Sequence, residues 1–152
     1  MIVFTSDTLE RITIDALERT AFVLVDPCAP DATIAPTHFA QVRLSGPANG
    51  ALIVGASDGF LRELASSLLG INPEDIEVES EGLDAIRELA NILGGSVLHD
   101  IGGQQSEFSL GLPTMVDAMA ESDSATCWFV CEGESLTVSC HGLKRNCIGR
   151  IA

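Results

Sequence analysis

A carboxylate and a carboxamide three positions apart, Glu88 and Asn91, are the residues of this sequence whose types and spacing best suit catalysis. Three residues return to nearly the same side of an α-helix, so both side chains would be held about one turn apart on a rigid element. Such a pair can position a cation and a water molecule together, as hydrolysis of an acyl phosphate requires. The carboxylate would pair with a lysine, and the amide would orient the attacking water.

The helix expected to carry this pair covers residues 83–98. One sector of it is apolar and predicts the core stripe, which consists of Ile86, Leu89, Ala90, Leu93 and Val97. The opposite side carries Asp84, Glu88 and Asn91 within about 60° of one another, and Gly95 completes this polar stripe. A glycine there leaves room for another protein's backbone beside Asn91. A polar face opposite an apolar one is also what any half-buried helix shows, so this pattern alone leaves a purely solvated face open.

Two further helices are expected before this one. The first covers residues 7–25 and ends at an Asp-Pro pair, with Asp7 and Glu10 in a cap-like arrangement at its start. The second covers residues 58–70, with an acidic cap and a glycine stop. An acidic connection at 72–82 leads from it to the helix of Glu88.

The strands are expected in antiparallel pairs. Alternating or β-branched runs bounded by turn residues predict strands at 39–44, 51–54, 107–112, 125–131 and 135–141. Pro113 closes the strand at 107–112, and residues 27–36 are expected to form a loop. The order of helix, hairpin, helix, helix, strand and hairpin indicates an α+β fold, in which antiparallel strands pack against helices.

A faint internal repeat divides the chain into two halves, each with a helix followed by strands. Residues 17–21 of the first half resemble residues 87–91 of the second, which places Glu18 at the position of Glu88 and Ala21 at that of Asn91. The first half would therefore have a carboxylate without its amide.

Composition predicts one soluble domain that covers residues 1–152. The chain has 46% hydrophobic residues, and it shows neither a secretory signal nor an apolar run long enough to span a membrane, so a cytoplasmic location is expected. Its net charge of −14 disfavours nucleic acids and anionic membrane surfaces as partners.

The cysteines and histidines suggest other chemistry, which their spacing disfavours. An odd number of cysteines in a chain without an export signal predicts free thiols, and Cys127 and Cys131 are expected to pack in the core rather than bind zinc with their neighbours and His141. Between Cys140 and Arg145 stand four residues, whereas the loop of a cysteine-dependent phosphatase has five. The three histidines show no metal-binding spacing, so no metal or other cofactor of the protein's own is expected.

The run Asp84-x-x-x-Glu88-x-x-Asn91, followed about twenty residues later by a strand and Pro113, resembles the signature of the CheX/CheC/FliY chemotaxis phosphatase family. One intact signature rather than two makes the chain most similar to the CheX branch. The resemblance implies a hydrolase of two-component signalling that removes phosphate from the phospho-aspartate of a CheY-type response regulator. Glu88 would grip a lysine of that partner, Asn91 would orient the water, and the partner would supply the Mg²⁺.

The same resemblance implies supporting roles and an oligomeric state. Asp84 would support the interface with the partner, and two copies of the chain would form a homodimer through strands. Gly95 is expected to contact the partner because of its place in the polar stripe, and not because of the resemblance. A non-catalytic module that docks a receiver domain or a flagellar switch component is the alternative function, and an adaptor in another two-component pathway is a third. A docking module should tolerate loss of the Asn91 amide, whereas a phosphatase should not.

Overall fold

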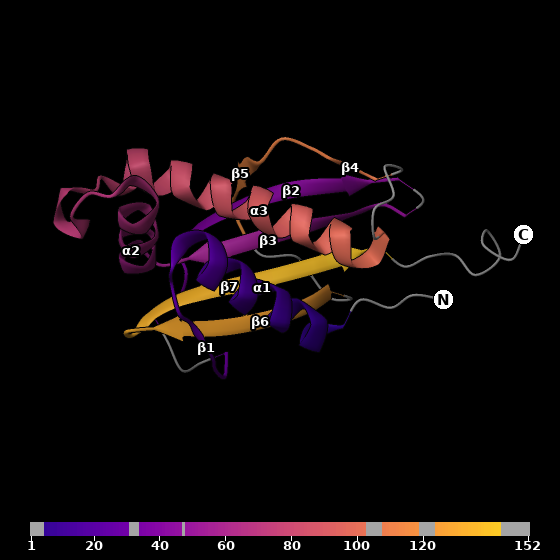
Figure 1. The fold of residues 1–152 in the computed structure, drawn as a ribbon, viewed down its shortest axis with the longest axis horizontal. Helices are drawn as coiled ribbons and strands as arrows, with labels where there is room; N and C mark the ends of the chain where they lie inside the picture. The colour runs from indigo at the N-terminus through magenta and orange to yellow at the C-terminus, as the bar shows by residue number, and fades with distance from the viewer. Residues whose placement is uncertain (1–4, 31–33, 47, 103–107, 119–123, 144–152) are drawn as a thin grey trace, which may run out of the picture.

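The computed structural model describes residues 5–30, 34–46, 48–102, 108–118 and 124–143 of the 152-residue chain. Helices and an antiparallel sheet form two layers, and α1 and α3 lie side by side over one face of the sheet (Figure 1). The α-helices are α1 (Ser6–Ala21), α2 (Asp58–Leu69) and α3 (Leu83–Gly102). The strands are β1 (Asp26–Pro27), β2 (His38–Ser45), β3 (Gly50–Ala56), β4 (Ser109–Leu110), β5 (Thr114–Val116), β6 (Ser124–Cys131) and β7 (Glu134–Gly142). The predicted α+β class is confirmed.

Two hairpins form the centre of the sheet. The strand order is β1-β6-β7-β3-β2-β4, with β5 also paired to β2, so the hairpins β2–β3 and β6–β7 meet where β3 pairs with β7. The turn between β6 and β7 contains Glu132 and Gly133 at φ 51° and 84°, the positive values that a tight hairpin turn needs. Both predicted hairpins are confirmed. Within the described residues, no helix is both long and apolar enough to cross a bilayer.

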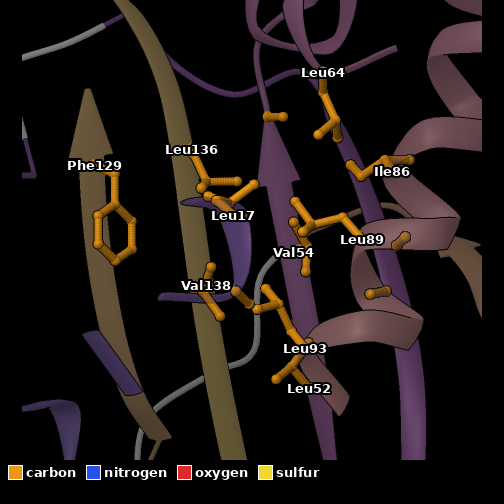
Figure 2. Close-up of a cluster of buried hydrophobic side chains, with 14 of the residues drawn as sticks. Leu17, Leu52, Val54, Leu64, Ile86, Leu89, Leu93, Phe129, Leu136 and Val138 are labelled. Carbon is orange, nitrogen blue, oxygen red and sulfur yellow. The ribbon is translucent and has the colours of Figure 1, made fainter. Parts of the chain in front are cut away.

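The apolar stripe of α3 packs against β2 and β3, as the sequence predicts. Leu89 and Leu93 are 1% and 0% exposed, and Figure 2 shows both side chains pointing toward Val54 and Leu52 of β3. Gly94 lies so close to β2 that a Cβ there would come within 3.0 Å of Val42 Cγ1. The helix can approach the sheet this closely because position 94 has no side chain.

Helix α1 packs on the other hairpin and ends four residues earlier than predicted. Its N-cap is Thr5, whose hydroxyl accepts a hydrogen bond from the backbone N–H of Thr8 at 3.2 Å, and not the expected Asp7 pair. Phe22 is the C-cap of α1 in the left-handed conformation, at φ 56°. Residues 22–25 alternate between exposed and buried side chains, and residues 23–25 after the cap no longer follow the helical period. The apolar run that suggested a longer helix therefore leaves the helix at Phe22, and β1 pairs with β6 at the Asp-Pro pair between the predicted helix and the predicted loop.

Helix α2 is tied at its start to the β6–β7 turn. The hydroxyl of Ser57 donates to Glu134 Oε1 at 2.8 Å and accepts from the backbone N–H of Ser135 at 2.9 Å. At its other end Gly70 adopts φ 74°, which confirms the predicted glycine stop. These contacts hold the hairpin turn and the helix start together, although 77 residues separate Ser57 from Glu134.

The segments before and after α3, and the end of α3 itself, differ in detail from the prediction. The acidic stretch after α2 contains a 3₁₀ turn (Pro73–Asp75) and a π-helical turn (Val78–Gly82) that runs directly into α3. Helix α3 extends to Gly102, beyond the expected end at residue 98, because its glycines do not interrupt the backbone hydrogen bonding. Of the strand expected at 107–112, residue 107 lies outside the described residues, and among 108–112 only β4 is a strand. The backbone N–H of Gly111 still donates to the Arg43 carbonyl oxygen of β2 at 2.8 Å, and the chain pairs with β2 again as β5.

The cysteines of β6 and β7 belong to the core. Cys127 and Cys140 are 5% and 4% exposed, and Cys131 packs partly buried against the same cluster. Burial raises the pKa of Cys140 to about 12, and burial together with Glu10 and Asp7 raises that of Cys127 to about 11. The predicted packing role is confirmed for these strands, while Cys147 lies outside the described residues.

We expect Leu93→Ala to lower the free energy of unfolding by about 2–5 kcal/mol, because it removes a fully buried side chain between α3 and the sheet. Leu112→Ala is the matched control, since Leu112 is 87% exposed and should change stability by less than about 0.5 kcal/mol. Urea denaturation followed by circular dichroism measures both. Equal effects of the two substitutions would contradict the packing of α3 described above.

Candidate functional site

Glu88 and Asn91 lie on the side of α3 that faces away from the sheet. Glu88 is exposed and Asn91 is half-buried, while Leu89 and Ala90 between them are in the core. Among the residues that the structure describes, neither the Glu88 carboxylate nor the Asn91 amide has a hydrogen bond or an ion pair. Both groups are therefore available to a partner without breaking a hydrogen bond or ion pair to any described residue.

Two grooves lie beside the exposed part of α3 that carries Glu88 and Asn91, which we call the ridge. The first, which we call the α2 groove, lies between the end of α2 and the start of α3 and has a volume of about 400 Å³. Its lining residues are Leu68, Leu69, Glu81, Asp84, Ala85 and Glu88. An apolar floor with three carboxylates around it suits a side chain with an aliphatic stem and a positively charged end, such as lysine.

The second, which we call the α1 groove, lies between α1 and α3 and has a volume of about 480 Å³. Asn91 and Gly95 line it from α3, and Arg11, Asp15 and Arg19 line it from α1. Gly95 leaves it open, because a Cβ at this position would have no atom within 4 Å. The predicted room for another backbone beside Asn91 is therefore present.

The structure places the predicted site residues on one helix but in different grooves. Asp84 and Glu88 line the α2 groove, whereas Asn91 and Gly95 line the α1 groove. Asp84 is held by an ion pair with Arg87, whose Nη2 lies 2.7 Å from Asp84 Oδ1. A partner that contacts both Glu88 and Asn91 must therefore lie across α3, with one group on each side.

Pro113, the last member of the predicted signature, lies between β4 and β5 at the β2 edge of the sheet. The described residues that line the two grooves do not include it. Its position between two short strands indicates that it shapes the chain path at this edge, because a proline cannot donate a hydrogen bond to a sheet ladder.

The arrangement of Glu88 and Asn91 on α3 can position groups that a partner supplies. Residues three positions apart are separated by about 4.5 Å of rise along a helix axis, so the carboxylate of Glu88 and the amide of Asn91 can hold a cation and a water at neighbouring points. Among the described residues, no group of three or more histidine, cysteine, aspartate or glutamate side chains is placed to hold a metal ion. The chemistry that the geometry supports is the positioning of reacting groups by Glu88 and Asn91.

The rival cysteine site has no reactive thiolate at neutral pH. Cys140 points into the core, and burial raises its pKa to about 12, so the thiol is protonated there. Lys144 and Arg145 of the same motif lie outside the described residues. His38 belongs to a different part of the surface, where its Nε2 lies 3.0 Å from Asp58 Oδ1.

Two arginines of α1 were not identified from the sequence as part of the site. Arg11 Nη2 lies 3.2 Å from Asp100 Oδ1 of α3, and Arg19 Nη2 lies 2.9 Å from Asp15 Oδ2. Residues 11, 15 and 19 recur every four positions, which places them on one face of a helix. That spacing was a usable signal, but only the packing of α1 beside α3 shows that this face borders Asn91.

The helix of the first half has the features that the internal repeat predicts for it. Glu18 is exposed on α1, and Ala21 is 2% exposed and forms part of the core. Helix α1 packs on β6 and β7, as α3 packs on β2 and β3, so each helix covers one hairpin. The amide chemistry of Asn91 has no counterpart at residue 21, because a buried alanine offers no hydrogen-bonding group.

Comparison with solved structures shows where this fold occurs. CheX from Vibrio vulnificus is 14% identical, with a TM-score of 0.71 over 90% of this chain and 94% of that one. A CheC-like superfamily protein from Shewanella sp. PV-4 is 18% identical, with a TM-score of 0.72 over 95% of this chain and 100% of that one. At these identities the likeness shows the fold alone.

A third similar chain comes from the CheX–CheY–BeF₃–Mg²⁺ complex of Borrelia burgdorferi. It is 14% identical, with a TM-score of 0.71 over 94% of this chain and 100% of that one. No curated protein sequence matches the chain. The family model for chemotaxis phosphatase CheX matches residues 39–134, a stretch that includes β2 apart from His38, all of β3 and the whole of α3. The chain therefore belongs to the CheX family of chemotaxis phosphatases.

Proposed function

We propose that this protein is a cytoplasmic phosphatase that hydrolyses the phospho-aspartate of a CheY-type response regulator. The observation that carries the proposal is the pair of uncommitted polar groups on α3, Glu88 and Asn91, in a chain of the CheX family. Family membership supports the reaction class, and the exposed ridge supports these two residues as its site. We also propose that residues 1–152 form a single CheX-like domain.

In the proposed reaction, water attacks the phosphorus atom and the bond between phosphorus and the aspartate oxygen breaks. The products are the free carboxylate and inorganic phosphate. The carbonyl oxygen of the Asn91 side chain accepts a hydrogen bond from the attacking water and so aligns it. The regulator supplies the Mg²⁺ that neutralises charge on the phosphoryl group. The Borrelia burgdorferi complex, which contains CheX, CheY, BeF₃ and Mg²⁺ together, supports this proposal.

Glu88 is proposed to pair with the lysine of the regulator. The α2 groove supports this role, because its leucines can cover the aliphatic part of a lysine while Glu88 meets the ammonium group. Asp84 and Glu81 line the same groove and add negative charge, although Arg87 already pairs with Asp84. Gly95 is proposed to admit the regulator's backbone on the other side of α3, beside Asn91.

Asn91→Ala should slow hydrolysis by about 10²-fold or more and leave binding nearly unchanged, because the amide acts mainly in the transition state. The measurement is the decay of a phosphorylated CheY-type regulator from the same organism, in the presence of Mg²⁺. Asn72→Ala is the matched control, since Asn72 is an exposed asparagine before the 3₁₀ turn and its side chain makes no capping hydrogen bond. Normal turnover by Asn91→Ala, with binding retained, would identify the protein as the docking module instead.

Glu88→Ala should weaken binding of the regulator by about tenfold, which corresponds to about 1.4 kcal/mol, because it leaves the regulator's lysine unpaired in the interface. Turnover at low regulator concentration should fall at least as much. Glu18→Ala serves as the control, because Glu18 is the exposed carboxylate of α1 that the internal repeat aligns with Glu88. If both substitutions have the same effect, Glu88 has no special role in the pairing.

We also propose that two copies of the chain form a homodimer through strands. In the structure, β1 pairs only with Val130 and Phe129 at one end of β6. Light scattering coupled to size-exclusion chromatography should give twice the chain mass of 16.0 kDa. A mass of 16.0 kDa at every concentration tested would show a monomer and would leave the α3 site unaffected.

A further inference from the structure

The two grooves beside α3 differ in the charges that line them. The α2 groove contains the carboxylates of Glu81, Asp84 and Glu88. The α1 groove contains two arginines and His99, set against the carboxylates of Asp15 and Asp100. Helix α3 therefore separates an acidic groove on the Glu88 side from a groove on the Asn91 side in which each arginine is paired with an aspartate.

Arginines are scarce in this chain, so their position in the α1 groove is informative. The net charge is −14, and the chain has 8 lysines and arginines in all. Lys144, Arg145 and Arg150 lie outside the described residues, and two of the five remaining arginines line the α1 groove. An anionic partner would be repelled by most of this acidic surface, and an arginine that exchanged its aspartate for the partner's anion would offer local attraction in the groove of Asn91.

The two arginines of the groove are held in different ways. Arg11 pairs with Asp100 and thereby links α1 to α3, so it helps to set the width of the groove. Arg19 pairs with Asp15 of its own helix, and the side chains of this pair are 65% and 54% exposed. The ion pair of Arg19 joins no separate elements, and an exposed pair of this kind stabilises the fold little. Arg19 can therefore exchange Asp15 for an anion of a partner without loosening the fold.

We propose that Arg19 attracts the phosphoryl-bearing side of the regulator into the α1 groove and makes the protein select the phosphorylated regulator over the unphosphorylated one. The inference rests on the proposed function, because it assumes that a phosphorylated receiver lies across α3. A guanidinium group suits this task, since its planar fork donates two parallel hydrogen bonds to phosphoryl or carboxylate oxygens. Arg19 is a specificity-determining residue in this scheme, and Asn91 retains its role in hydrolysis.

Asp15 competes with the partner for Arg19 in this arrangement. Removing the Asp15 charge should release Arg19 and strengthen binding, whereas removing the Arg19 charge should weaken it. The two changes therefore act in opposite directions at one exposed ion pair. A merely structural role for the pair predicts the same direction for both, since either substitution would break it.

The test measures the affinity of full-length protein for a CheY-type regulator with Mg²⁺, with and without beryllofluoride as the phosphoryl mimic. Arg19→Gln should weaken binding of the beryllofluoride form by about tenfold, and that of the free form by less than about twofold. Asp15→Asn should strengthen binding of the beryllofluoride form by about threefold at low salt. Arg43→Gln is the control, because Arg43 is an exposed arginine of β2 that lines neither groove beside α3.

The possible outcomes distinguish a failure of the role proposed for Arg19 from a failure of the proposed phosphatase function. Selective loss with Arg19→Gln, a gain with Asp15→Asn and no change with Arg43→Gln would support the inference. Equal loss for both forms of the regulator, or equal effects of the Arg19 and Arg43 substitutions, would overturn it while the phosphatase proposal stands. If the wild-type protein binds neither form, the proposed partner is wrong and the inference falls with it.

Discussion

The fit of the apolar stripe of α3 against β2 and β3 is the constraint on which the rest of the site depends. Leu89 and Leu93 are almost completely buried, and Gly94 allows the helix to lie close to Val42. A rotation of the helix would expose these leucines to water, which costs about 1.5–3 kcal/mol for each side chain. The core thereby fixes the direction of Glu88 and Asn91, although neither residue is part of it.

The second constraint is the position of α1 beside α3. Each helix covers one hairpin, and the pairing of β3 with β7 brings the two hairpins, and hence the two helices, together. The space left between the helices becomes the α1 groove, and Arg11 and Asp100 connect its two walls. The groove is thus a consequence of the sheet order, and its charge comes from the residues that α1 presents there.

The chemistry that fits this ridge depends on positioning. In the proposed reaction, the partner brings the phosphoryl group, the lysine and the Mg²⁺, while this chain brings a carboxylate and an amide that α3 holds in place. Groups held on a rigid element lose little freedom when the partner binds, so they can act with little reorganisation. The same ridge without its amide could still bind a partner, which is why Asn91 separates a phosphatase from a docking module.

The amino-acid sequence by itself determined the class of the fold, the two hairpins, the core stripe of α3 and the polar stripe with Glu88 and Asn91. These features follow from local periodicity and turn residues, which one segment contains without reference to another. The end of α1 was not predicted, because the apolar residues 22–25 suit a helix as well as an extended chain until the sheet buries two of them. Only the tertiary structure decided that Asn91 and Glu88 border different grooves, and that Arg19 lies in the groove of Asn91. The physical reason is that a groove between helices depends on contacts between residues far apart in the chain, and helical spacing within one segment cannot specify those contacts.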